Sequence, residues 1–110
     1  METKEFTRDW YAWINFMPPK PDEFHAVGEV LVGNPGVQAE LCARESGGSS
    51  ATTLLLDLHL VQRPGMWPQV VTWVQCRYQK VLTPGKPKYD SVEVFYDGAS
   101  IAKIEVDEVH

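Results

Sequence analysis

The chain has 110 residues, of which 44% are hydrophobic and 23% are charged, a balance typical of a folded domain rather than a disordered or fibrous chain. Ten basic and fifteen acidic residues give a formal net charge of −5, which argues against nucleic acid or an anionic membrane as the main partner. We therefore expect residues 1–110 to form a single domain.

The ends and the cysteines predict a soluble, cytoplasmic protein without a membrane partner. Residues 1–6 carry two acids and lack the apolar run of a secretory signal, and the cluster at 53–58 is too short to span a bilayer. Cys42 and Cys76 have no CxxC spacing, so no metal, cofactor or disulfide is expected. Both are interpreted as small buried side chains within strands.

Residues 4–16 are predicted to form an amphipathic helix. Thr3 can cap its start, and Pro18 and Pro19 cannot continue it. The large apolar side chains recur at offsets of four, seven, eight and eleven, which is a helical stripe: Phe6, Trp10, Trp13, Ile14 and Met17.

After the prolines the apolar period changes to two, which predicts strands. The sequence Asn34-Pro35-Gly36 predicts a type II turn with Gly36 at positive φ, and therefore a tight hairpin between the first two strands. The expected strands lie at about residues 24–33, 37–45, 52–63, 70–82, 91–96 and 100–107.

The last two strands can be placed in register from the sequence. Apolar residues face apolar ones and charged residues face charged ones when the residue numbers of each facing pair sum to 196. This register implies a three-residue loop, 97–99. The expected pairs are Val92 with Ile104, Glu93 with Lys103, and Val94 with Ala102.

These elements predict a mainly β fold that borders on α+β. Six strands joined by short connections favour an antiparallel meander, because parallel neighbours would require crossover connections that the chain has no room for. We expect a curved sheet or small barrel with the N-terminal helix packed on one face or one end.

Four polar residues are weak candidates for acid–base or metal chemistry. Asp57 and His59 share one face of a predicted strand, and His25 and Glu29 share a face of another. A metal site requires three or four converging ligands, so no metal is expected and the pairs are interpreted as solvent-facing polar residues.

Two groups of apolar residues are candidates for binding. A pocket under the N-terminal helix is expected to be lined by Trp10, Trp13, Leu54, Leu56 and Tyr78. Met66 and Trp67, between two prolines, either fold over one end of the barrel as a lid or present a partner-binding surface.

Residues 77–88 form a basic stretch that contains Arg77, Lys80, Lys86 and Lys88 beside two tyrosines, Tyr78 and Tyr89. The net acidity of the chain favours solvated lysines over a nucleic-acid site.

The sequence thus predicts a non-enzymatic binding module that acts through protein–protein contact or self-association. Two alternatives stay open. One is a small apolar or aromatic ligand under the helix, and the other is an enzyme or metal site built from the four polar residues.

Overall fold

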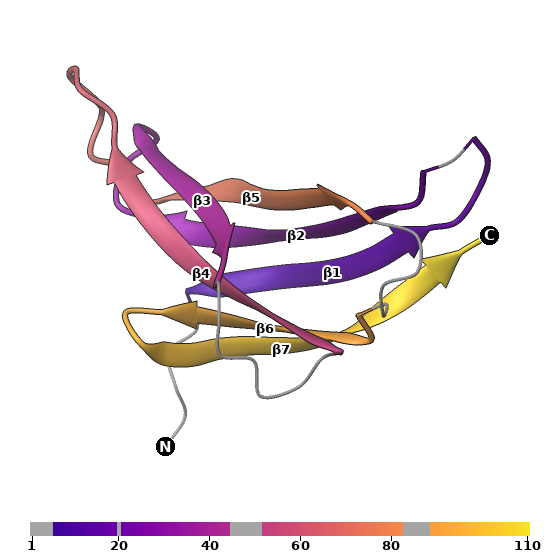
Figure 1. The fold of residues 1–110 in the computed structure, drawn as a ribbon. Helices are drawn as coiled ribbons and strands as arrows, with labels where there is room; N and C mark the ends of the chain where they lie inside the picture. The colour runs from indigo at the N-terminus through magenta and orange to yellow at the C-terminus, as the bar shows by residue number, and fades with distance from the viewer. Residues whose placement is uncertain (1–5, 20, 45–51, 83–88) are drawn as a thin grey trace.

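A computed structural model describes residues 6–19, 21–44, 52–82 and 89–110, and within these ranges the chain forms strands and no helix (Figure 1). The expected N-terminal helix is therefore wrong. The described strands are β1 (Thr7–Asn15), β2 (Glu23–Val32), β3 (Val37–Ala43), β4 (Thr53–Gln62), β5 (Thr72–Val81), β6 (Ser91–Tyr96) and β7 (Ala99–Val109).

The strands form a nearly closed barrel in the order β3-β4-β6-β7-β1-β2-β5. β7 joins its two halves, because its first part pairs with β6 and its last residues pair with β1. One half contains β1, β2 and β5, and the other contains β3, β4 and β6. The two outermost strands, β3 and β5, lie close together and so nearly close the barrel.

A bulge interrupts the alternation of β1. The pairing with β2 shifts between Arg8 and Tyr11, so that Asp9 and Trp10 both lie opposite Gly28. Asp9 has a φ of 59°, which accommodates the extra residue. The bulge changes the spacing of inward residues from two to three between Thr7 and Trp10. The predicted helical stripe combines inward Trp10 and Ile14 with Trp13, which lies on the outer face.

The expected meander is also wrong, because the strands do not all pair with their neighbours in sequence. β2 pairs with β1 and β5, whereas β3 pairs with β4 in the other half of the barrel. Two pairs are parallel, β1 with β7 and β4 with β6. Parallel pairing needs no helix here, because β5, which lies between β4 and β6 in sequence, belongs to the opposite half.

The turn at residues 34–36 carries the chain from one half of the barrel to the other. Val37 N donates to Asn34 O at 3.3 Å, and Gly36 N donates to Asn34 Oδ1 at 2.8 Å. Gly36 is not among the residues with positive φ, so the type II turn is wrong. Glycine is needed here because a β-carbon would collide with the indole ring of Trp67.

The predicted register of the last hairpin is confirmed for the three pairs of residues 92–94 with 102–104. The three-residue loop is wrong, because a bulge that leaves Ile101 as the extra residue shifts the pairing of Phe95 to Ser100. The turn then contains only Asp97 and Gly98, whose φ values of 54° and 84° fit a type I′ hairpin turn.

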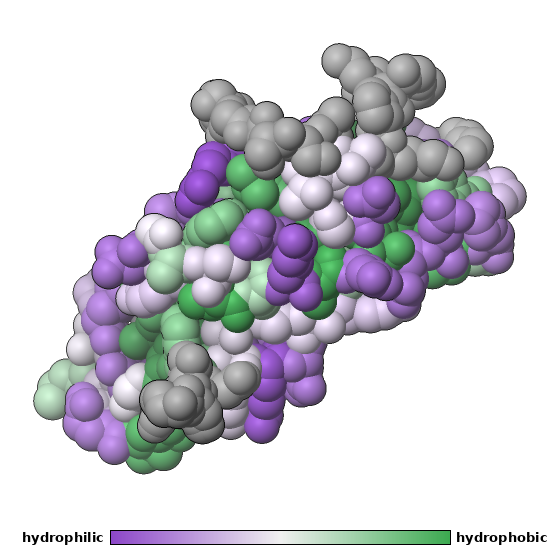
Figure 2. All heavy atoms as spheres, turned by 90° about the horizontal axis from the view of Figure 1, so that it is seen from below, coloured by the Kyte–Doolittle hydropathy of each residue, from purple (hydrophilic) through white to green (hydrophobic). Residues whose placement is uncertain are grey.

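The core lies inside the barrel and follows the predicted alternation. The fully buried large side chains are Phe24, Ile14, Leu56, Val30, Val92, Val94 and Cys76. On the face that Figure 2 shows, hydrophobic residues lie between hydrophilic ones along the length of the molecule. The described residues contain no helix that is long and apolar enough to cross a bilayer.

Candidate functional site

The four polar candidates do not converge. Asp57 is held by Arg44, whose Nη2 lies 2.6 Å from Asp57 Oδ1 and whose Nε donates to Oδ2 at 3.2 Å. This hydrogen bonding by the guanidinium lowers the pKa of the Asp57 carboxyl. His59 lies exposed two residues further along the outer face of β4.

His25 and Glu29 lie on the other half of the barrel. The His25 ring stacks on Trp13 with centroids 4.9 Å apart, and Arg8 Nε donates to Glu29 Oε1 at 2.8 Å. Across the described ranges, no three His, Cys, Asp or Glu side chains come together to hold a metal ion. The polar pairs therefore occupy separate outer faces.

The five residues expected to line a pocket under a helix are also distributed over different places. Trp10 packs inside the barrel above Gly28, whereas Trp13 lies on the outer face in the stack with Tyr11 and His25. Leu54 and Leu56 are buried core residues. Tyr78 packs edge-on against Phe24, and burial raises the pKa of its phenol.

The loop between β4 and β5 combines an anchor with an exposed apolar residue. Trp67 Nε1 donates to Arg63 O at 3.0 Å, and the Arg63 guanidinium lies 4.8 Å from the Trp67 ring centroid. Arg63 also donates to Pro35 O at 3.2 Å, which ties the loop to the turn before β3. Met66, by contrast, is 98% exposed.

The basic stretch does not form one surface in its described part. Arg77 and Lys80 lie on opposite sides of β5, since their positions differ by an odd number. Lys80 Nζ donates to Tyr89 Oη at 3.2 Å. Lys86 and Lys88 lie outside the described residues.

The two cysteines are free and differ in environment. Cys76 is buried, its thiol donates to Gly28 O at 3.6 Å, and burial raises its pKa to about 11. Cys42 lies exposed on the outer side of β3, so its expected burial is wrong.

This difference predicts that a thiol reagent such as Ellman's reagent will label Cys42 in the folded protein at pH 8, and Cys76 only after unfolding in urea. The thiolate is the reacting form, and Cys76 is neutral and buried at that pH. Cys42→Ser should abolish labelling of the folded protein. Rapid labelling of Cys76 in that variant would contradict its placement in the core.

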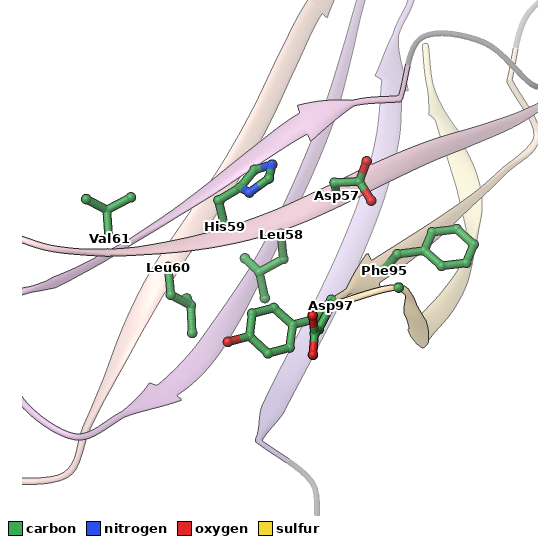
Figure 3. A pocket seen from close by; sticks show the side chains of 9 residues that line it. Asp57, Leu58, His59, Leu60, Val61, Phe95 and Asp97 are labelled. Carbon is green, nitrogen blue, oxygen red and sulfur yellow. The ribbon is translucent and has the colours of Figure 1, made fainter.

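A depression of about 500 Å³ lies between the second half of β4 and the β6–β7 turn (Figure 3). We call it the β4 groove. Leu58 and Leu60 point to one side of β4, and His59 points to the other (Figure 3). The groove is lined by Asp57, Leu58, His59, Leu60, Val61, Phe95, Tyr96, Asp97 and Gly98.

The groove exists because β4 and β6 separate. Their parallel pairing ends at Asp57 and Phe95, after which β4 continues toward the loop before β5 with β3 as its one paired neighbour among the described strands (Figure 1). β6 ends one residue later and turns back into β7. Within the described part of the chain, the edge of β4 from residue 58 to 62 therefore has no paired strand on the side of β6.

Two backbone hydrogen bonds show which groups face this open side. Arg44 N donates to Leu55 O at 2.8 Å, and Arg63 N donates to Gly36 O at 2.9 Å. Bonding therefore alternates so that odd-numbered residues of β4 direct their N–H and C=O groups toward β3. Leu58, Leu60 and Gln62 direct theirs to the open side, where the first two residues line the groove.

The outer rim of the groove is fixed by Arg44. Its guanidinium bonds to Asp57 and lies 4.2 Å from the ring centroid of Phe95. Arg44 therefore links β4 to β6 at the last residue pair before the two strands separate. Tyr96 is held by an edge-on contact with Phe6 at 5.4 Å. Asp97 adds an exposed carboxylate at the end of the groove.

The sequence pattern singles out Asp57 and His59 but not the residues of β6 and its turn that line the groove with them. Phe95 and Asp97 are predicted only as hairpin residues, and Tyr96 is predicted as one of the aromatic residues in excess of what a core of this size needs. Comparison of the chain with protein-family models, with curated proteins and with solved structures finds no match.

Proposed function

We propose that the chain is a non-enzymatic binding module that docks a protein partner on the β4 groove and the adjoining loop 63–71. The open edge of β4 beside an exposed apolar loop carries this proposal. Val61 connects the two parts, since it lines the groove and precedes the loop by two residues.

The exposed side chains are of the kind that interfaces bury. Met66 is 98% exposed, and Val70 and Val71 are 56% and 66% exposed in the same loop. Neighbouring apolar side chains exposed on a soluble surface mark interaction sites. The contacts of Trp67 with Gly36 and Arg63 hold the loop in place, which lowers the entropy lost on binding.

Site-specific photocrosslinking in cells of the natural source tests this function. We expect p-benzoylphenylalanine at Met66 or His59 to give an adduct of the same defined mass, and the same residue at Gln79, exposed on β5, to give none. Mass spectrometry then identifies the adduct, and a mass equal to two chains indicates self-association.

Binding of the purified, identified partner provides the control. Met66→Asp places a charge in the apolar contact and should weaken binding by about tenfold or more, whereas Gln79→Asp should leave it unchanged. Equal adducts from all three positions, or no adduct from Met66 and His59, would contradict the proposed function.

A further inference from the structure

We infer that the occupant of the β4 groove is an extended segment of the partner protein that adds to β4 as a strand. This inference rests on the proposed function and specifies the form of the partner. The edge of β4 between residues 58 and 62 presents backbone donors and acceptors at the strand repeat, and an extended backbone complements such an edge.

The backbone geometry selects a strand over a helix or a flat surface. The N–H groups of Leu60 and Gln62 face the open side of β4, while Val61 between them bonds to β3. Every second residue of an added segment can therefore bond to β4 without disturbing the existing ladder. A helix satisfies its own backbone groups and leaves this edge unpaired.

The two sides of the edge differ in chemistry, which sets the pattern of the segment. Leu58 and Leu60 point to one side, and Asp57 and His59 point to the other (Figure 3). Because side chains of a strand alternate, the segment should carry apolar residues at every second position and polar residues between them.

The length of the free edge and the charge near it define the partner segment further. The free edge covers five residues of β4, from Leu58 to Gln62, which corresponds to about 17 Å of strand at the usual rise. Asp97 at the end of the groove and the net charge of −5 favour a segment with at least one Lys or Arg.

Random twelve-residue peptides displayed on phage and selected against the intact chain provide the probe. A selected peptide is expected to shift the amide resonances of residues 58–61 and 95–98 and to slow hydrogen exchange at Leu60 and Gln62. N-methylation of its backbone at successive positions should weaken binding by about tenfold at alternate residues and by less than about threefold at the others.

A pair of variants tests the same backbone group on the protein. Leu60→Pro removes the N–H that faces the groove and spares the bonds to β3, so it should weaken peptide binding by about tenfold. Leu60→Ala, which keeps the N–H, should weaken it less. The N-methylated peptides leave the protein unchanged, so the inference stays testable even if Leu60→Pro fails to fold.

The outcomes separate this inference from the proposed function. Groove binding that tolerates N-methylation at every position would overturn strand addition and leave the groove as a binding site. Slow hydrogen exchange at the amides of Leu60 and Gln62 in a dimer that forms without peptide would overturn the inference, because a second copy of the chain would then occupy the edge. If no selected peptide shifts the resonances of the groove residues, strand addition is overturned. If crosslinking from His59 and Met66 also gives no adduct, the proposed partner binding is overturned as well.

Discussion

Replacing Phe24 with alanine is expected to lower the free energy of unfolding by about 3–5 kcal/mol, the usual cost of removing a buried aromatic ring. Phe24 is 0% exposed and packs edge-on against Tyr78 and Tyr89 at centroid distances of 6.2 and 5.5 Å. The cavity would open between β2, β5 and the start of β6. Urea denaturation followed by tryptophan fluorescence measures the change.

Met66→Ala is the matched control for Phe24→Ala, since it removes a large apolar side chain that is 98% exposed. We expect it to change the free energy of unfolding by less than about 0.5 kcal/mol. Similar losses in both variants would show that Phe24 is not a core residue.

Gly28→Ala is expected to destabilise the protein by about 1–3 kcal/mol through overpacking. The added β-carbon would lie inside contact distance of the Trp10 ring, which the bulge of β1 places directly above Gly28. The ring must then move, and its bond from Nε1 to Thr7 Oγ1, 3.1 Å long, must lengthen or break. Thermal and urea unfolding measure the loss.

A double-mutant cycle identifies the cause of the Gly28→Ala effect. With Trp10→Leu already present, Gly28→Ala should cost clearly less, because the colliding ring is gone. Gly33→Ala provides the control for a loss of glycine flexibility, since no heavy atom lies within 4 Å of its added β-carbon. An equal cost of Gly28→Ala in both backgrounds would contradict the proposed contact.

The inward and outward alternation of the strands could be predicted because it depends on local pattern. Leu54, Leu56 and Leu58 follow a period of two and are buried as expected. The register of the β6–β7 hairpin was predictable because a one-residue slip would bury Glu93 and Lys103. This argument does not predict the bulge at Ile101.

The N-terminal helix was predicted wrongly because a spacing of four, as between Trp10 and Ile14, places residues on one face of a strand as well as of a helix. Trp13 completed the helical pattern although it lies on the outer face. The composition of residues 7–14 contained the opposing signal, since threonine, tryptophan, tyrosine and isoleucine favour strands. In this segment the preference for strands outweighs the helical periodicity.

The topology and the site were not predictable, because both depend on long-range pairing. The turn at residues 34–36 has the composition of a hairpin turn and yet passes between the two halves of the barrel. The β4 groove forms only where parallel β4 and β6 separate, so no local pattern could bring Leu60 near Tyr96.

The position of β7 has a consequence for synthesis on the ribosome. β1 is synthesised well before this neighbour, because Ala12 pairs with Val106, which is 94 positions later (106 − 12). At about 5–20 residues per second, β1 waits several seconds or longer for this neighbour. Its edge toward β7 is unpaired meanwhile, so the nascent chain presents an aromatic strand to chaperones until β7 has emerged from the ribosome.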